Sequence, residues 1–327
     1  MTSSERIQVS AIEPAQNLAQ VFLISQPQLR ATSNGKKYIA AFLSDKTGRA
    51  NSRMWQATET VFNSLPEEGF VFVRGRSEMY QNSLQIVVEE IRPIDESKVD
   101  LIEFLPGTKF DITTMFEEVK DILRQIKHPA VRHLVKAFLD DADLMDKFCK
   151  APAAAVLHHA WIGGLLEHTL NLMRLGKNIL PLYPHLDHDI VLSSLFLHDI
   201  GKTTELVYDI SFKYSDQGRM IGHLVKGTIM IEGKVAELIK QGVDMPRGLI
   251  DSIEHVIVAH HGQREYGSPV TPVTPEAFLV HYIDNIDSKM QMTQDEIAKD
   301  PSNGDWTNYI KAIEGPIYKK HNQYKVD

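Results

Sequence analysis

Residues 195–206 read LFLHDIGKTTEL, and this stretch sets a histidine and an aspartate directly after an apolar run. Such a run enters a core, where His198 and Asp199 are costly because both side chains lose water on burial. One explanation is a helix that simply ends at Gly201. The other is a metal ion, which would satisfy the imidazole and the carboxylate together.

The remaining histidines favour the metal ion. Eleven of the 14 histidines lie between His158 and His281, and several interrupt apolar runs that are expected to be helices. Imidazole and carboxylate groups that converge from separate helices suit divalent ions, and two such ions can activate water for phosphodiester cleavage. The expected elements, in chain order, are His168, His198 with Asp199, His223, His260 with His261, and Asp284.

Composition limits the class of protein. The chain has 327 residues and a formal net charge of -8, and its length predicts about two domains. Cys149 is the only cysteine, which excludes an intrachain disulfide and a thiolate metal cluster. Neither a secretion signal nor an apolar segment long enough to cross a membrane is visible, so we expect a cytoplasmic protein without a membrane partner.

The N-terminal part, residues 1–95, has the alternating pattern of strands and is neutral in charge. Two alternating runs flank a turn at residues 45–48, where Gly48 is expected to take the positive φ of a hairpin loop. A short helix is expected over 57–64, and the runs FVFVRGRSEMY and SLQIVVEEIRPI are expected to pair through Gln81 and Asn82. Three strands, a short helix and two strands is the order of an OB-fold, a small all-β barrel.

The rest of the chain has a helical period. Residues 103–111, with Pro106 and Gly107, indicate a connection, so we expect a linker over 96–112 and an all-α domain over 113–327. The acidic excess of the chain lies in this second part, which suits a cation site. Helices are expected over 113–126, 129–140, 158–178, 188–199, 216–241, 246–262 and 275–292.

Basic and aromatic residues of the barrel indicate a nucleic-acid surface. OB-fold barrels often hold single strands by stacking bases on aromatic rings while Lys and Arg follow the phosphates. The alternative is that the rings are core residues and the charges a solvated face. The expected contacts are Lys36, Tyr38, Arg49, Arg53, Trp55, Arg74 and Arg76, with Arg264 and Tyr266 at the entrance of the helical site.

The order of the metal-binding elements resembles the HD-domain phosphohydrolase superfamily, and its additional histidines resemble the branch that binds at least two ions. Together with the barrel, the segments HHAWIGGLLEHTL, FLHDIGKTTEL, GHLVKG and HHGQREYGSPVTPVTPEAFLVHYIDNIDSKM resemble the YhaM family of bacterial 3′→5′ exoribonucleases over nearly the whole chain. The resemblance implies removal of nucleoside 5′-monophosphates from the 3′ end of single-stranded RNA, with single-stranded DNA as a further substrate. It implies two divalent ions per chain, with Mn²⁺ first and Fe²⁺, Co²⁺ or Mg²⁺ as alternatives.

The resemblance also implies roles for individual residues. Asp199 would bridge two ions, one completed by His168, His198 and Asp284, and the other by His223, His260 and His261. Lys202 would neutralise charge on the phosphate, or else be an exposed lysine after a helix C-terminus, where positive charge is favourable. His158 and His159 would contact the phosphate or protonate the leaving oxygen, or else be structural. No serine or cysteine nucleophile is apparent, since Cys149 has no evident base nearby.

Other functions remain open at this point. One is a nucleotide or signalling-nucleotide phosphohydrolase whose barrel serves to form a homo-oligomer. The segment GQREYGSP (262–269) lacks the Gly-Tyr-Pro signature of related cyclic-dinucleotide phosphodiesterases, which counts against that sister function. Another is a nucleic-acid-binding protein without catalysis, and a third is a barrel that binds a protein, because a fold alone does not fix the ligand.

Overall fold

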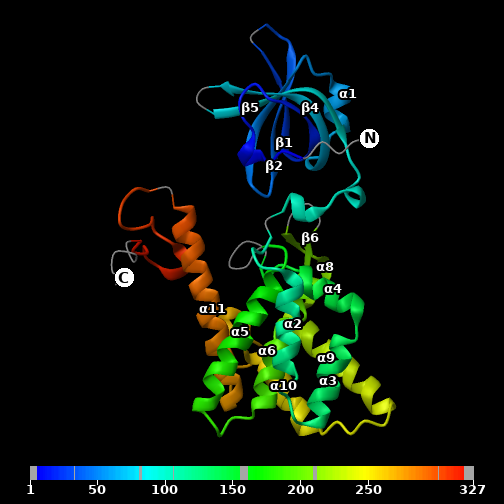
Figure 1. Cartoon of the computed structure of the whole chain (residues 1–327), viewed down its shortest axis with the longest axis vertical. Coiled ribbons are helices and arrows are strands. Elements are labelled where there is room, and N and C mark those ends of the chain that lie inside the picture. Colours follow the sequence, from blue (N-terminus) through cyan, green and yellow to red (C-terminus); the bar gives the residue numbers. More distant parts are fainter. Residues whose placement is uncertain are drawn as a thin grey trace. The chain divides into compact units, whose positions relative to one another are not determined.

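The computed structural model describes residues 6–32, 34–80, 83–105, 107–154, 161–208, 212–300 and 302–319. The chain divides into two units, of which the first comprises the described residues up to Gly107 together with Tyr208, and the second comprises the other described residues from Thr108 on. Figure 1 follows the chain from the blue barrel to the red C-terminal part. His158, His159, Gln81 and Asn82, which the sequence singled out, lie outside the described residues.

The first unit is a closed barrel of five strands in the order β1-β2-β3-β5-β4. The pairing of β3 with β5 is parallel and the other four pairings are antiparallel. This is the predicted OB-fold, and the prediction is confirmed. The elements are η1 Val9–Ala11, β1 Asn17–Ala31, β2 Lys37–Asp45, β3 Gly48–Trp55, α1 Glu59–Ser64, β4 Glu68–Tyr80 and β5 Ser83–Pro93.

Alternation along the strands fills the barrel interior. Every second residue of β2 is buried, from Ile39 to Asp45, while Tyr38 and Phe42 lie on the outer face. The interior is therefore a core of aliphatic and aromatic side chains, among them Leu18, Phe22, Ile24, Leu43, Val71, Val73 and Ile86. The same alternation leaves the outer face free for polar and aromatic groups.

The turn between β2 and β3 differs from the expectation. Gly48 does not have a positive φ; it pairs with Asp45 as the first residue of β3. The Asp45 carboxylate accepts hydrogen bonds from the backbone N–H of Thr47 at 2.7 Å and from its hydroxyl at 2.6 Å. A side-chain-stabilised turn of this kind replaces the glycine conformation that the sequence suggested.

The segment after the barrel, where the sequence predicts a linker, begins with two short helical turns. It forms η2 Glu96–Lys98 and η3 Leu101–Glu103, and both Phe104 and Leu105 are buried. The Phe104 ring lies edge-on to Phe70 with centroids 5.1 Å apart, and the Arg6 guanidinium lies 3.9 Å above it. Residues 96–105 therefore extend the packing of the first unit.

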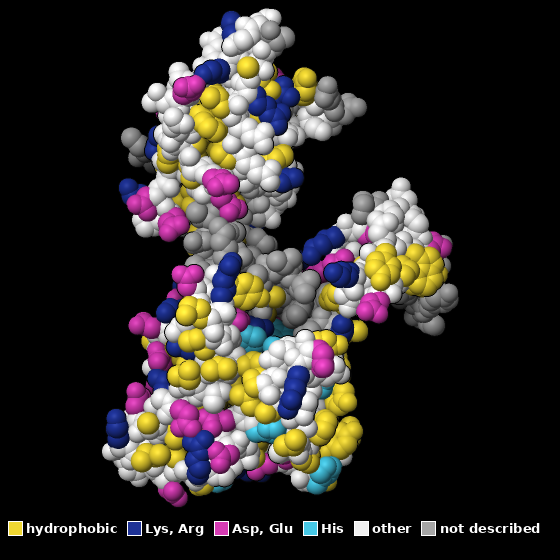
Figure 2. Space-filling view, turned by 180° about the vertical axis from the view of Figure 1, so that it is seen from behind, with side chains coloured by type: hydrophobic (Ala, Val, Ile, Leu, Met, Phe, Trp, Pro, Cys, Tyr) yellow, Lys and Arg dark blue, Asp and Glu magenta, His cyan; other side chains and the backbone are white. Residues whose placement is uncertain are grey.

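The second unit is helical. Its elements are α2 Ile112–Leu123, α3 Pro129–Leu139, α4 Ala142–Lys150, α5 Gly164–Ile179, η4 Leu180–Leu182, α6 His188–Leu197, α7 Lys202–Glu205, β6 Leu206–Tyr208, β7 Phe212–Tyr214, α8 Asp216–Ile221, α9 His223–Lys240, α10 Arg247–Ala259, η5 Arg264–Tyr266, α11 Pro275–Lys299 and η6 Lys311–Ile313. None of the helices among the described residues is long and apolar enough to cross a membrane. Every histidine visible in Figure 2 lies on this unit.

Three helix predictions need correction. The helix expected over 216–241 is two helices, α8 and α9, because Gly222 takes φ 74° between them. The helix expected from residue 158 is described from Gly164. Helix α4 was not expected; Asp141 caps it by accepting a hydrogen bond from the backbone N–H of Leu144, and Asp143 lies in its first turn.

Helix α6 is the centre of the helical unit. Every residue from Ile190 to Leu197 is buried, so this helix is apolar on all sides rather than amphipathic. It packs against α5, α10 and α11. Its C-terminal end therefore delivers His198 and Asp199 to a point where three other helices converge.

Candidate metal centre

The structure brings all seven predicted metal ligands together inside the helical unit. They come from five places in the chain that are far apart in sequence: the first turns of α5, the end of α6, the start of α9, the end of α10 and the middle of α11. Three groups of these side chains have ligand atoms within 4.8 Å of one another: His223, His260 and His261; His168, His198 and Asp284; and His198, Asp199 and His260.

Asp199 lies between two sets of ligands. The first set is His168, His198 and Asp284, and the second set is His223, His260 and His261. Its Oδ2 is 3.2 Å from Nε2 of His198 and 3.8 Å from Nε2 of His168. Its Oδ1 is 3.4 Å from Nε2 of His223 and 3.6 Å from Nε2 of His260. Each oxygen of one carboxylate therefore faces a different set of imidazoles, which is the geometry that a bridging ligand needs.

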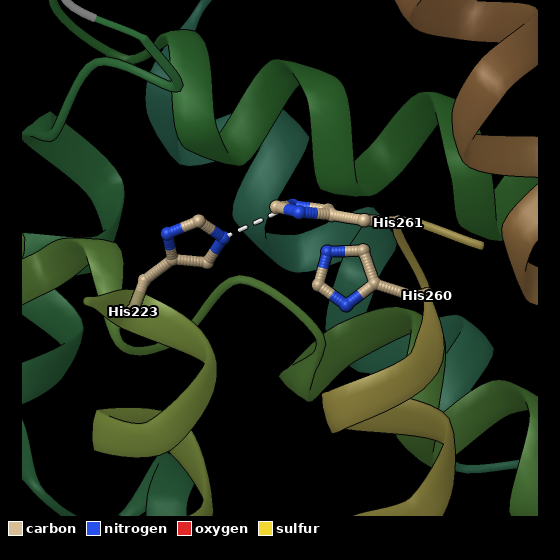
Figure 3. A group of neighbouring side chains, drawn as sticks. All are labelled: His223, His260 and His261. Carbon is tan, nitrogen blue, oxygen red and sulfur yellow. Dashed lines mark hydrogen bonds between the residues drawn. The ribbon is translucent and has the colours of Figure 1, made fainter. Parts of the chain in front are cut away.

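Within each set the ligand atoms are spaced as they would be around one ion. Nε2 of His168 is 3.3 Å from Nε2 of His198 and 3.2 Å from Oδ1 of Asp284. In the other set, Nε2 of His223 and of His261 are 3.3 Å apart (Figure 3). Bonds of about 2.1 Å to one ion place neighbouring ligand atoms roughly 3.0–3.4 Å apart.

The opposite nitrogen of every ligand imidazole is fixed by a hydrogen bond. Each Nδ1–H donates to an oxygen that accepts, which orients the ring and leaves the Nε2 lone pair toward the centre. The bonds run from His168 to the Asp287 carboxylate (2.7 Å), His198 to the Leu195 carbonyl (2.9 Å), His223 to the Glu205 carboxylate (2.8 Å), His260 to the Ile257 carbonyl (2.8 Å) and His261 to the Tyr266 carbonyl (2.8 Å).

This arrangement fits divalent cations. Two facing Nε2 lone pairs repel unless a proton or a cation lies between them, and the centre contains two such pairs. Asp199 Oδ1 is buried and has no hydrogen-bond partner. An unpaired buried carboxylate oxygen is costly. Nitrogen and carboxylate ligands of this kind suit hard or borderline divalent ions, so the residues that are present satisfy the requirement for a metal site.

Protons and a cation compete for the first set. Burial disfavours a charged His168 ring, but hydrogen bonds and charge from Asp284 and Asp287 outweigh burial and raise the pKa of His168 to about 9. Burial would raise the pKa of Asp284, yet the His168 hydrogen bond and charge lower it far below its ordinary value. Metal binding at this set must therefore release a proton from His168.

Two histidines of the second set, His260 and His261, stay neutral at neutral pH. Burial is the largest cause that lowers the pKa of His260, and together with the neighbouring charges of His260 and His223 it lowers the pKa of His261 to about 3. A neutral imidazole is the form that binds a metal ion. These histidines therefore offer lone pairs at neutral pH without first losing a proton.

Lys202 contacts the bridging carboxylate directly. Its Nζ lies 2.7 Å from Asp199 Oδ2. Burial would lower the pKa of Lys202, but the charge of Asp199 outweighs it and the pKa is raised. Burial would likewise raise the pKa of Asp199, and Lys202 is the first of the charges that instead lower it well below its ordinary value. The pair therefore remains an ammonium and a carboxylate over the neutral range.

Gly201 explains how His223 reaches Asp199. A Cβ at Gly201 would lie 2.1 Å from the backbone oxygen of His223 and 2.9 Å from the backbone nitrogen of Gly227. Only glycine allows the start of α9 to approach the end of α6 so closely. The glycine of the HDIGK stretch is thus a packing requirement of the metal centre.

Glu205 is a site residue that the sequence analysis missed. Its carboxylate accepts both the backbone N–H of His223 at 3.1 Å and the Nδ1–H of the same ring at 2.8 Å. It is 8% exposed and therefore shielded from competing water. The only signal in the sequence was an acidic residue shortly after Lys202, in the same short helix.

A cavity of about 660 Å³ opens onto the centre. This volume lies within the range of roughly 300–1,000 Å³ that is usual for ligand sites. Tyr266, predicted at the entrance, does line the cavity, whereas Arg264 does not. Tyr214, Asn285, Ser288 and Lys289 line it as well and were not predicted.

A second hollow, of about 320 Å³, lies on the barrel between β1, β2, β3 and β5. Among the predicted contacts it is lined by Tyr38 and Arg53. The Arg53 guanidinium lies 4.8 Å from the ring of Tyr80, 5.5 Å from that of Trp55 and 5.9 Å from that of Tyr38. This groove therefore combines a cation with the rings of Tyr38 and Tyr80, the composition that holds single strands. Trp55 does not line the groove, but its ring lies beside that of Tyr38, with centroids 5.1 Å apart.

The other predicted barrel contacts lie elsewhere. Lys36 and Arg49 do not line the groove, and Arg49 lies 4.0 Å above the Phe42 ring. Arg74 and Arg76 are on β4, which pairs with β1 and β5 rather than with β2 or β3, and Arg74 forms a 2.8 Å ion pair with Glu90. The groove instead has polar residues that the analysis did not single out, namely Gln26, Gln28, Arg30, Asn51, Tyr80 and Gln85.

Comparison with family models defines the class of protein. Residues 165–289 match the HD domain, and residues 23–94 match an OB-fold nucleic acid binding domain. The HD match contains all seven ligands of the centre. The chain is thus a hydrolase of the HD phosphohydrolase class, joined to an OB-fold.

Two curated relatives identify the family. The 3′-5′ exoribonuclease YhaM of Bacillus velezensis is 33% identical over 315 residues, which cover 94% of this chain and 96% of the relative. That of Bacillus subtilis is 30% identical over 318 residues, which cover 96% and 98%. The chain belongs to the YhaM 3′-5′ exoribonuclease family.

Among solved structures, the second OB-fold domain of replication protein A from Methanococcus maripaludis is 19% identical. It covers 28% of this chain and 95% of its own, with a TM-score of 0.23. A replication protein A heterotrimer bound to ssDNA matches 30% of this chain and 72% of its own at 23% identity and a TM-score of 0.21.

Proposed function

We propose that this protein is a metal-dependent 3′-5′ exoribonuclease that releases nucleoside 5′-monophosphates from single-stranded RNA. The observation that carries the proposal is the placement of Asp199, whose two oxygens face two sets of imidazole lone pairs in a chain of the YhaM family. Divalent ions held there would polarise the scissile phosphodiester and activate water for attack.

The protein's own residues prepare the cavity for a phosphate. The fixed Nδ1–H bonds hold five rings in one orientation, so little rearrangement is needed when the substrate arrives. Lys202 keeps Asp199 ionised and adds positive charge beside it. Exposed Tyr266 and Tyr214 line the same cavity and are suited to contact a base.

No covalent intermediate on Cys149 is part of this mechanism. Burial, and then the charge of Asp146, raise the pKa of the Cys149 thiol to about 12. The thiol therefore stays protonated near neutral pH and is a poor nucleophile. Water is the nucleophile that remains.

The groove on the barrel would capture the strand. Stacking on Tyr38, Trp55 and Tyr80 tolerates every base, and Arg53 among them adds charge for the backbone. Such a surface prefers unpaired RNA over A-form duplex, whose bases are already stacked.

The proposal also covers the number and identity of the metal ions, the second substrate, the compartment and the oligomeric state. Two sets of ligands support two ions per chain, and a nitrogen- and oxygen-only donor set is compatible with Mn²⁺. Stacking on aromatic rings accepts the bases of DNA as well as those of RNA, which supports action on single-stranded DNA as well. A single cysteine is compatible with the cytoplasm, and self-association is a further expectation.

The test is a time course of 5′-labelled single-stranded RNA with the full chain and Mn²⁺, resolved on a denaturing gel. We expect a descending ladder of labelled products that chelator and His198→Ala abolish. Immediate release of labelled mononucleotide would mean attack from the 5′ end and would contradict the proposal. Intact RNA, with hydrolysis of free nucleotides instead, would assign the centre to a nucleotide phosphohydrolase.

A further inference from the structure

The part of the chain after α11 forms a small ordered lobe that the proposed function does not yet use. We call residues 302–319 the C-terminal lobe. Backbone bonds close it: Thr307 N–H donates to Ile317 at 2.9 Å, and Ile310 N–H to Gly315 at 3.1 Å. Lys319 Nζ joins the lobe to the end of α11 through Asp300 Oδ1 at 3.0 Å.

The lobe exposes aromatic rings. Trp306 is 54% exposed, Tyr309 68% and Tyr318 37%. The Trp306 and Tyr318 rings lie side by side, with centroids 5.0 Å apart and planes inclined by 55°. Figure 2 shows hydrophobic side chains gathered on this lobe. A cluster of rings that the fold leaves in water, on an element held rigid by its own hydrogen bonds, marks an interaction surface.

The lobe adjoins the cavity of the metal centre. Ala312, in η6, is one of the residues that line that cavity. Helix α11 connects the two, because Asp284 is a predicted metal ligand, while Asn285, Ser288 and Lys289 line the cavity farther along the helix. Five residues of helix separate Asp284 from Lys289, about 7.5 Å along the axis.

Lys289 is the positively charged residue that α11 contributes to the wall of the cavity. It is exposed, and no ion pair with it is found among the described residues. Lys202, the other lysine of the cavity, is already paired with Asp199. The lobe itself is close to neutral, with Lys311 and Lys319 against Asp305 and Glu314. Its rings, rather than its charge, are therefore the feature that selects a ligand.

We infer that Lys289 and the C-terminal lobe bind the nucleotides that immediately precede the 3′ terminus of a single-stranded RNA, with a phosphate on Lys289 and bases stacked on Trp306 and its neighbours. This inference rests on the proposed function. A strand whose terminal nucleotide occupies the cavity must leave it through the mouth. The wall formed by α11 and the lobe offers an exposed cation, and the lobe adds exposed rings, which together are the features of single-strand sites.

The test compares two substrates on the full chain with Mn²⁺: a single-stranded RNA of about 20 nucleotides and bis(p-nitrophenyl) phosphate, a small diester that cannot reach the lobe. For Trp306→Ala we expect kcat/KM on the RNA to fall on the order of 10-fold, the usual effect of losing one stacked base. Hydrolysis of the small diester should stay unchanged. Trp306→Phe should keep most of the RNA activity, because it keeps a ring.

Lys289→Ala provides a second readout that does not depend on the fold of the lobe. Removing one phosphate contact should reduce the slope of log affinity against log salt by about 0.7 for a single strand. Tyr183→Ala is the matched control, because Tyr183 is 46% exposed and lies outside the cavity and the lobe. It should behave as the unaltered protein on both substrates.

Three results would overturn the inference. One is unchanged RNA hydrolysis by Trp306→Ala, and another is an equal loss on both substrates, which would make the lobe a structural support. A third is a change of oligomeric state in size-exclusion chromatography with RNA binding intact, which would assign the rings to a second copy of the chain. If the unaltered protein leaves RNA intact but cleaves the small diester, the proposed function fails first, and that result is separate from these three.

Discussion

The metal centre and the barrel groove recognise a substrate by opposite physical means. In the centre, His168 is 1% exposed and Asp199 2%, and each imidazole is held by a partner on its far side. In the groove, Tyr80 is 42% exposed, as is Trp55 beside it at 43%, and the contacts are between rings and a guanidinium. One region is buried, charged and fixed, and the other is open and adaptable.

This difference shows how the two regions divide the work. A buried polar cluster depends on every member, since one missing partner leaves another group unpaired in a low dielectric. Stacking surfaces lose affinity in small steps and accept any base. Substitutions in the centre should therefore abolish chemistry, whereas substitutions in the groove should only weaken capture.

The largest effect is expected from Asp199→Asn. The change keeps the size of the side chain but removes the charge that faces both histidine sets. RNA hydrolysis should fall by about 10³-fold or more, as when a central electrostatic group is lost. The metal content of the purified protein, measured by mass spectrometry, should fall with it. Asp244→Asn, an exposed carboxylate on the same unit, is the control.

RNA affinity sharpens that experiment. If the metal centre and the groove act separately, Asp199→Asn still binds single-stranded RNA through the barrel in an anisotropy titration. A variant that loses binding and hydrolysis together would show that the centre and the groove do not act separately.

The next effect is expected from Glu205→Gln. An amide cannot offer His223 the same charged acceptor for its Nδ1–H, so the ring loses its orientation. Metal affinity should fall roughly 10- to 100-fold, the usual effect of removing such a partner. The measurement is the dependence of the rate on Mn²⁺ concentration, with Glu237→Gln as the control on the exposed side of α9. Failure of saturating Mn²⁺ to restore the rate would give Glu205 a role beyond orientation.

A smaller effect is expected from Tyr38→Ala in the groove. Loss of one stacking ring should weaken the binding of single-stranded RNA on the order of 10-fold. Hydrolysis of a small diester should not change, and Tyr38→Phe should bind nearly as well as the unaltered protein. If Tyr38→Phe lost as much RNA affinity as Tyr38→Ala, the hydroxyl, and not the ring, would make the contact.

The smallest effect is expected from Arg74→Ala. Arg74 lies on β4, outside the groove, and pairs with Glu90 on the surface. Surface ion pairs of this kind contribute little, and RNA affinity should change less than about 2-fold. Anisotropy at two salt concentrations measures it. A loss comparable to that of Tyr38→Ala would place the strand along β4 and would contradict the assignment of the groove.

Much of the fold follows from local patterns. The strands alternate, and the helices carry apolar periods, so the OB-fold and the helical class are both readable from the sequence. The break at Gly222 was not readable, because the pattern on either side of it is helical and only the φ of one glycine separates α8 from α9. Likewise Asp45, rather than the conformation of Gly48, makes the turn between β2 and β3.

The metal centre was more accessible to sequence analysis than its supports. Histidine and aspartate inside apolar helices are unusual enough to be noticed one by one, as at His168 and Asp284. Glu205 lies in a short helix among ordinary polar residues, and only the folded structure places it against His223. The backbone carbonyls that hold His198 and His260 have no sequence signal at all.

The groove was the hardest part to predict. Arg49 and Arg53 share one face of β3, yet Arg53 lines the groove while Arg49 lies on Phe42. Which outward residues surround a hollow depends on the closure and twist of the barrel, which alternation does not encode. Gln28 and Gln85 both line this hollow although they lie on strands at opposite ends of the barrel sequence.

The position of Asp199 has one further consequence. Because a single carboxylate faces both histidine sets, in the two-ion arrangement proposed above the ions share a ligand and cannot bind independently. Thermodynamic reciprocity then requires each ion to change the affinity of the other by the same factor. A metal titration of this protein should follow one cooperative or anticooperative isotherm, and Asp199→Asn should separate whatever binding remains into uncoupled events.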